Sequence, residues 1–179
     1  MPLLCLLGRH GSGKSTIGAA LQAYGYRHLS IGALRRVAQS NQFPSDVPAG
    51  LVSAMRRERP GAPLSPLTAR RLVEHANSVG QLVLDGFPSS ADHVALLRPD
   101  TVFCVVWAPA LLREARLHAR AASSKRLWTP GLASARETAL PDLIRQVRLT
   151  HRCLFIANAG SVDAAALLLV RKISESRVA

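Results

Sequence analysis

Five short apolar runs are spaced along the chain and alternate with stretches that have helical character. The runs are Leu3–Leu7, a weaker one at His28–Ser30, Gln81–Asp85, Val102–Trp107 and Cys153–Ala157. Two of them are followed directly by glycine, and a third is followed by Ala108-Pro109; glycine and proline end strands. Strands that alternate with helices predict a parallel sheet covered by helices on both faces. We therefore expect an α/β fold with five parallel strands, built as one domain over residues 1–179.

The stretches between the runs carry the end signals of helices. Ser65 is a good N-cap and Pro66 suits the first helical position, while Asp163 and Arg171-Lys172 complement the dipole of a last helix. The expected helices are Ser15–Ala23, Gly32–Ser40, Pro48–Arg59, Ser65–Asn77, Pro109–Ala122, Leu140–Leu149 and Val162–Ile173. The segment Ser123–Thr138 has few apolar residues and contains Thr-Pro-Gly, which predicts an exposed loop.

Composition limits the classes of protein. An apolar content of 48% argues against disorder, and no apolar run is long enough to cross a bilayer. The N-terminal run is too short for a secretory signal, so we expect a protein that is not secreted and lies in the cytoplasm or in an organelle such as the mitochondrion. Cys5, Cys104 and Cys153 lack the close spacing of zinc or redox motifs, which predicts reduced core thiols.

The formal net charge is +12, and the arginines that produce it are scattered. Such a balance attracts polyanions, so nucleotides, RNA or an acidic protein are candidate partners. The alternative is a solvated face in a sequence rich in Arg and Ala. Aromatic residues make up only 4%, which argues against sequence-specific RNA readout. We expect a monomer unless the chain belongs to an assembly.

The strongest motif is GRHGSGKST at residues 8–16. It follows a predicted strand and opens a predicted helix, which is the context of a phosphate-binding loop. Its glycines allow the backbone to curl so that amides point inward at a helix N-terminus. Lys14 would reach the β- and γ-phosphates and Ser15 would bind Mg²⁺. The motif predicts that ATP with Mg²⁺ is held by Gly8, Arg9, His10, Gly11, Ser12, Gly13, Lys14, Ser15 and Thr16; the alternative is a glycine turn that binds nothing.

Two later segments, taken with this loop, resemble the adenylate kinase and nucleoside monophosphate kinase family. HLSIGALRR at 28–36 is similar to the family's HISTGDLLR, and VLDGFP at 83–88 is similar to its LLDGFPR. The resemblance runs from residue 1 to about 120 and continues weakly to the end. It implies a three-layer P-loop NTPase fold with a core at 1–30, 80–120 and 140–179. A small acceptor-binding lobe at about 31–77 and a short lid at about 121–138 would complete it.

The resemblance also implies roles for single residues. Asp85, at the end of its strand, would hold Mg²⁺ together with Ser15, although it could also be a turn cap. The acceptor would be bound by Ser30, Gly32, Arg36, Gly86 and His93, of which Arg36 grips the acceptor phosphate, Gly86 admits the base and His93 stands where a Gln often reads adenine. The catalytic set would be Lys14, Arg116, Arg120, Arg136 and Arg145. The spacing allows Arg148 in place of Arg145, and Arg116 with Arg120 could instead form a solvated basic face.

The pattern fails on the acceptor side. Ser89 replaces the arginine of the family's DGFPR, Ile31 and Ala33 replace its Thr and Asp, and Glu137-Thr138 stand where the lid has an acidic pair. One missing charge-assisted bond costs about 1.5–3 kcal/mol, which weakens binding roughly tenfold to a hundredfold.

Three functions remain open. The first is a nucleoside monophosphate kinase that transfers the ATP γ-phosphoryl with Mg²⁺, with AMP as the expected acceptor. The second is a catalytically weakened, adenylate-kinase-like nucleotide-binding subunit of a larger assembly, which could contain RNA. The third, a kinase of shikimate or gluconate type, would not explain the LDGFP segment.

Overall fold

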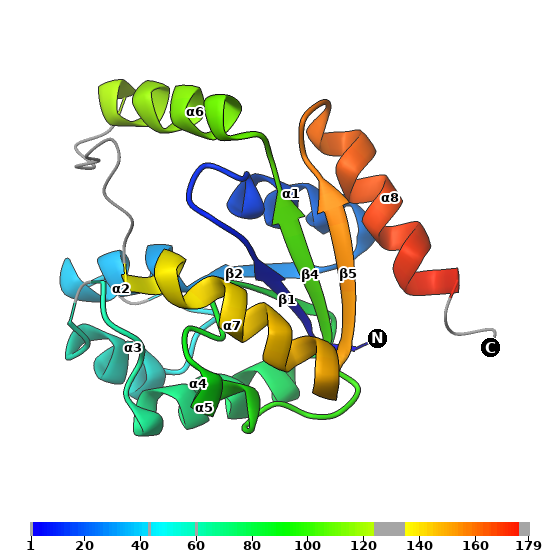
Figure 1. Cartoon of the computed structure of the whole chain (residues 1–179). Coiled ribbons are helices and arrows are strands. Elements are labelled where there is room, and N and C mark those ends of the chain that lie inside the picture. Colours follow the sequence, from blue (N-terminus) through cyan, green and yellow to red (C-terminus); the bar gives the residue numbers. More distant parts are fainter. Residues whose placement is uncertain (1, 43, 60, 124–134, 176–179) are drawn as a thin grey trace.

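A computed structural model of the chain describes residues 2–42, 44–59, 61–123 and 135–175, with only the backbone given at 135 and 136. Five parallel strands form one sheet in the order β2-β3-β1-β4-β5 (Figure 1). The strands are β1 (Leu4–Leu7), β2 (Arg27–Ser30), β3 (Leu82–Asp85), β4 (Val102–Trp107) and β5 (Arg152–Ala157). The expected α/β fold with a five-stranded parallel sheet is confirmed, because each predicted apolar run is a strand with nearly the same ends.

Helices cover both faces of this sheet (Figure 1). They are α1 (Lys14–Ala20), α2 (Ile31–Gln39), α3 (Ala49–Arg56), α4 (Pro66–Val79), α5 (Ala91–Val94), α6 (Ala110–Ser123), α7 (Ala135–Thr150) and α8 (Val162–Glu175). A short 3₁₀ turn, η1 (Leu21–Tyr24), follows α1. In Figure 1, α6 extends beyond the sheet on the side where β4 and β5 end.

Alternation along the strands creates two hydrophobic cores. Leu4 and Leu6 of β1 lie in the core shared with α1 and α8, whereas Cys5 and Leu7 lie in the core shared with α2, α3, α4 and α7. All four residues of β1 are buried. A central strand of this kind has helices on both sides and therefore reads as a continuous apolar run.

The loop predicted at Ser123–Thr138 is too long at both ends. Ser123 is the last residue of α6, and α7 begins at Ala135, five residues before the expected start. Pro141 is next to the expected first residue, where proline suits the first turn of a helix, but it lies inside α7. Glu137 in the first turn suits the positive end of the helix dipole. The expected lid otherwise falls on 124–134, which lie outside the described residues.

Residues 31–77 form α2, α3 and most of α4, and a buried arginine holds them together. Arg35 is only 8% exposed and donates to the Arg59 carbonyl at 3.0 Å and to the Ala62 carbonyl at 3.4 Å. Glu58 accepts from the amide and hydroxyl of Ser65, the residue that caps α4 as predicted. The connection between α3 and α4 is therefore fixed by charge-assisted hydrogen bonds.

The cysteines are free, as expected for reduced thiols. Cys5 and Cys104 are buried and Cys153 is half-buried, and burial raises the pKa of Cys104 to about 12. None of the helices in the described ranges combines the length and the apolar character needed to cross a bilayer.

Two leucines test the packing. Leu84 of β3 is 0% exposed, whereas Leu149 of α7 is 83% exposed. We expect Leu84→Ala to lower the free energy of unfolding by about 2–5 kcal/mol, because it leaves a cavity in a close-packed core. Leu149→Ala should change it by less than about 0.5 kcal/mol. Urea unfolding measures both, and similar losses would contradict the assignment of the core.

Candidate active site

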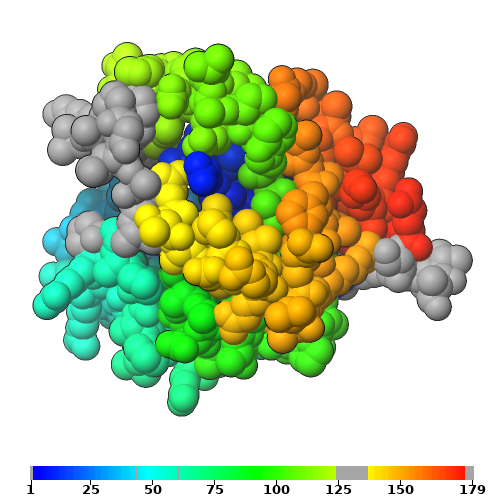
Figure 2. Space-filling view, in the orientation of Figure 1, coloured from blue at the N-terminus to red at the C-terminus, as the bar shows by residue number. Residues whose placement is uncertain are grey.

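A cavity of about 1390 Å³ opens at the carboxyl ends of the strands. In Figure 2 the N-terminal loop (blue) is visible at the bottom of a hollow bordered by α6 (green) and α7 (yellow). One part of its lining, here called the loop half, consists of Gly8, His10, Gly11, Gly13, Lys14, Ser15, Thr16, Arg116, Arg120 and Asn158. The other part, called the lobe half, includes Ser30, Gly32, Arg36, Asp46, Gly86, Ser89, Ser90, Leu140, Asp142, Leu143 and Gln146.

The glycine loop is tightly enclosed. Gly13 has φ 89° and precedes α1, and a Cβ there would lie 2.1 Å from Nδ2 of Asn158. Gly11 has φ 76°, and a Cβ there would lie 2.5 Å from the carbonyl oxygen of Arg113. Side chains are therefore excluded, and backbone amides at a helix N-terminus can approach an anion directly.

Asn158 supports this loop from below, although the sequence did not single it out. It follows β5, is 1% exposed, and donates from Nδ2 to the Ser12 carbonyl at 2.9 Å. Its own amide donates to the Trp107 carbonyl at 2.7 Å. Its position just after the last predicted strand is a usable clue, because the ends of parallel strands meet at one edge of the sheet.

Arginines of α6 reach the same loop from above. Nη1 of Arg116 lies 3.5 Å from the Gly11 carbonyl, and Nη1 of Arg113 lies 3.4 Å from the His10 carbonyl. Arg116 and Arg120 both line the cavity. The four-residue spacing predicted for them thus brings two guanidinium groups to the loop half, while Arg113 was not predicted.

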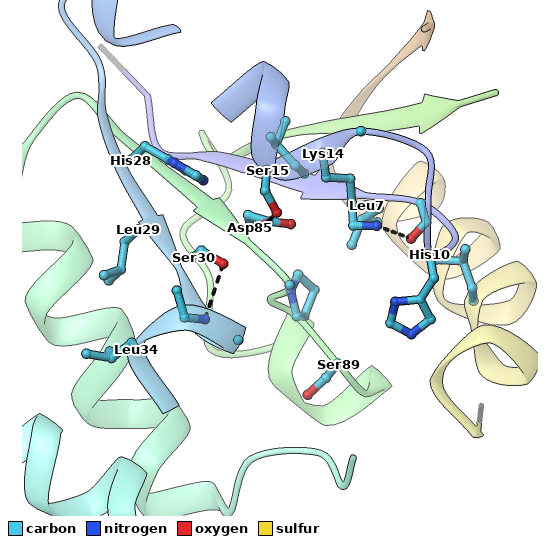
Figure 3. A pocket seen from close by; sticks show the side chains of 18 of the residues that line it. Leu7, His10, Lys14, Ser15, His28, Leu29, Ser30, Leu34, Asp85 and Ser89 are labelled. Atoms are coloured by element: carbon cyan, nitrogen blue, oxygen red, sulfur yellow. Dashed lines mark hydrogen bonds between the residues drawn. The ribbon is translucent and has the colours of Figure 1, made fainter. Parts of the chain in front are cut away.

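Lys14 lies at the mouth of the loop. Its Nζ donates to the Gly8 carbonyl at 2.7 Å and to the Arg9 carbonyl at 2.9 Å (Figure 3). Arg9 itself is exposed and contributes its carbonyl, while Ser12 is 1% exposed beneath the loop. The ammonium group therefore lies where it can bind an anion in the loop half.

Ser15 and Asp85 face each other across the start of α1 and the end of β3 (Figure 3). The Ser15 hydroxyl donates to the Asp85 carboxylate, which is 5% exposed. No group of three or more His, Cys, Asp or Glu in the described ranges is placed to hold a metal ion. One hydroxyl and one carboxylate nevertheless fit Mg²⁺, which usually completes its coordination with phosphate oxygens and water.

His28 of β2 also lines the cavity near this carboxylate. Burial lowers its pKa, and the negative charge of Asp85 opposes that shift without cancelling it. The imidazole is therefore neutral at neutral pH, and the cationic character of the loop half comes from Lys14 and the α6 arginines.

In the lobe half the structure brings together four of the five residues predicted for the acceptor, namely Ser30, Gly32, Arg36 and Gly86. Ser30 caps α2 by accepting from the Ala33 amide at 3.4 Å. A Cβ at Gly32 would lie 3.5 Å from Nη1 of Arg36, so the guanidinium group passes close to this glycine.

His93, the fifth, is not part of the cavity lining. It is 3% exposed and stacks on Phe87 with ring centroids 5.0 Å apart. Its Nε2 donates to the Leu64 carbonyl at 3.0 Å, which leaves Nδ1 to accept from the Ser89 amide at 3.3 Å. The imidazole satisfies buried backbone groups, so its position does not support the predicted role in reading a base.

The predicted arginines of α7 are not brought to the cavity either. The side chain of Arg145 is 75% exposed and pairs with Asp142 at 2.8 Å, and Arg148 lies over the ring of Phe155. The α7 residues that line the cavity are Glu137, Ala139, Leu140, Asp142, Leu143 and Gln146, and neither Arg145 nor Arg148 is among them. The side chain of Arg136 lies outside the described residues.

Comparison with known proteins identifies the fold. No family model and no curated protein matches the sequence. A gluconokinase from Sinorhizobium meliloti is 19% identical, with a TM-score of 0.59 over 99% of this chain and 95% of that one. A shikimate kinase from Acinetobacter baumannii, in complex with shikimate, is 17% identical, with a TM-score of 0.62 over 100% and 96%. TT1252 from Thermus thermophilus is 24% identical, with a TM-score of 0.52 over 97% of both chains. The chain therefore has the P-loop kinase fold, whereas the narrower resemblance to adenylate kinases stays a prediction.

Two glycines test the enclosure of the loop. Gly13→Ala should lower the free energy of unfolding by at least about 1–2 kcal/mol, because an L side chain is strained in the left-handed region and its Cβ meets Asn158. Gly160→Ala is the matched control, since nothing lies within 4 Å of a Cβ there. Urea unfolding of both variants measures the difference, and equal losses would show that the loop has more room than described.

Proposed function

We propose that the protein is a phosphotransferase that uses ATP with Mg²⁺. One observation carries the proposal: the glycine loop before α1, the Lys14 ammonium group and the Ser15–Asp85 pair line a single cavity. Amides at a helix N-terminus and a lysine suit the phosphate chain of a nucleotide. The P-loop kinase fold of the chain is consistent with this chemistry.

The size of the cavity supports a reaction between two ligands. Sites for a single small molecule typically enclose about 300–1,000 Å³, and this cavity has about 1390 Å³. The loop half would take the donor, and the lobe half would place an acceptor beside its terminal phosphate. Bringing the two reactants together in line supplies much of the catalysis of phosphoryl transfer.

The cations of the loop half would provide the remaining stabilisation. Lys14 would leave the carbonyls of Gly8 and Arg9 to contact the β- and γ-phosphates. Arg116 and Arg120 would neutralise charge that develops on the transferred phosphoryl group. Mg²⁺, held by Ser15 and Asp85, would bridge phosphate oxygens. We keep Arg136 in the catalytic set as a proposal, whereas the outward position of Arg145 argues against its inclusion.

For the acceptor we infer a nucleoside monophosphate, with AMP as the first candidate. Among the described residues that line the lobe half, Arg36 is the only one with a cationic Lys or Arg side chain. Its guanidinium group can take a phosphate through two parallel bonds. Gly86 and the LDGFP segment, which lines the lobe half on both sides of Phe87, match the base-binding part of the family pattern.

A small hydroxy acid is the second candidate acceptor. One cation, the hydroxyls of Ser30, Ser89 and Ser90, and the amide of Gln146 would suit one carboxylate and several hydroxyl groups. Two proteins of similar fold are a gluconokinase and a shikimate kinase bound to shikimate. The third possibility is a weakened, nucleotide-binding subunit of an assembly, in which neither kind of acceptor is phosphorylated.

An acceptor screen separates these possibilities. With Mg²⁺ and ATP, we expect ADP formation that depends on AMP and exceeds that with CMP, UMP, GMP, dAMP, gluconate or shikimate. Lys14→Ala is the control, because it removes the ammonium group and keeps the loop glycines. Turnover with a hydroxy acid alone would replace the inferred acceptor. A rate no higher than that of Lys14→Ala with every acceptor would remove the enzymatic function.

Restoring the arginine at Ser89 tests the acceptor side more sharply. Ser89 lines the lobe half, and its hydroxyl lies 3.3 Å from Nδ1 of the buried His93. An arginine in its place would turn from His93 into the cavity to meet a phosphate. We expect Ser89→Arg to lower the KM for AMP by about tenfold or more, because a charge-assisted bond is worth about 1.5–3 kcal/mol. The KM for ATP should stay unchanged. Ser89→Met controls for size, and an equal effect of both variants would contradict the missing-clamp explanation.

A further inference from the structure

The first turn of α7 is bonded to the glycine loop. Oε1 of Glu137 accepts from the His10 amide at 2.8 Å, across 127 residues of sequence. Both residues line the cavity, and Figure 3 shows His10 beside the ribbon of α7 (pale yellow). A carboxylate from a distant helix is thus bound by an amide in the middle of the loop.

This contact conflicts with an anion in the loop. A carboxylate oxygen and a phosphate oxygen both accept a hydrogen bond from a backbone N–H group. The single proton of the His10 amide cannot serve both fully. The negative charge of Glu137 also repels a phosphate chain placed a few ångströms away.

We propose that Glu137 is an internal competitor for the phosphate chain, so that nucleotide binding displaces it from the His10 amide. This inference rests on the proposed function, because it assumes that the loop takes phosphate. In the ligand-free protein the carboxylate holds the first turn of α7 against the loop. Phosphate oxygens take over the amide and release that turn.

Displacement couples the two halves of the cavity. Helix α7 contributes Leu140, Leu143 and Gln146 to the lobe half, directly after the turn that carries Glu137. A change at the start of α7 therefore alters the surface that faces the acceptor. A donor that moves Glu137 changes acceptor affinity, and linkage makes this effect reciprocal.

Two variants isolate the contact. Glu137→Gln removes the charge and keeps the size. Asp142→Asn is the matched control, because Asp142 carries the same charge, lies in the next turn of α7 and lines the same cavity. Its carboxylate accepts from Arg145. Inorganic tripolyphosphate with Mg²⁺ is the ligand, measured by calorimetry, so that neither the base nor the acceptor matters.

We expect Glu137→Gln to bind tripolyphosphate about tenfold more tightly than the wild type, which corresponds to one charge-assisted bond removed from the competition. Asp142→Asn should gain less than about twofold, because the Asp142 carboxylate is paired with Arg145 and an exposed ion pair contributes little. Equal gains would overturn the proposal, since they would reflect net charge alone.

Amide exchange supplies a readout that needs no ligand. In the ligand-free protein, the His10 amide should exchange faster in Glu137→Ala than in the wild type, and Asp142→Asn should leave it unchanged. Unchanged exchange in Glu137→Ala would overturn the proposal. ATP turnover can be absent while Glu137→Gln binds tripolyphosphate more tightly and Glu137→Ala exchanges the His10 amide faster. In that case the proposed function fails, and the proposal that Glu137 competes with phosphate is supported. If neither the wild type nor Glu137→Gln binds tripolyphosphate, both fail.

Discussion

The absence of space around the glycine loop is the constraint on which the site depends. A Cβ at Gly8 would lie 2.3 Å from the Val106 carbonyl, and Gly11 and Gly13 are as closely approached by α6 and by Asn158. The loop shape is thus set by backbone and side chains from the ends of β4 and β5 and from α6. Because the parallel sheet fixes the positions of these elements, the same packing that forms the fold also shapes the glycine loop.

Charge is distributed unevenly over the cavity. Lys14, Arg116 and Arg120 surround the loop half, and Arg36 lines the lobe half. The neighbouring Arg35 is turned inward and holds the α3–α4 connection, so adjacent arginines have different tasks. The loop half therefore has more of the cations that the proposed phosphoryl transfer needs than the lobe half has. The carboxylate of Glu137 adds an anion beside the loop, and we propose that the phosphate chain displaces it.

The sequence was sufficient for the sheet and the loop because both are local signals. Short apolar runs ended by glycine or proline specify strands, and GRHGSGKST specifies a loop between a strand and a helix. It was insufficient where a role depends on packing. Pro141 suggested a helix start although the helix accommodates it in its interior. His93 and Arg145 matched the family pattern by position. However, His93 is buried and bonds to backbone groups, and the side chain of Arg145 is exposed to solvent. Asn158 matters only because β5 ends beneath the loop.

The central claim is that this loop encloses the phosphate chain of a nucleotide. Calorimetric titration of the full chain with Mg²⁺ and ATP at low ionic strength tests it directly. The account predicts one binding site per chain, with an affinity that falls when Mg²⁺ is omitted, because Ser15 and Asp85 then have no cation to hold against the phosphates. An absence of binding heat across temperatures, with Mg²⁺ present, would contradict it and leave only the architecture.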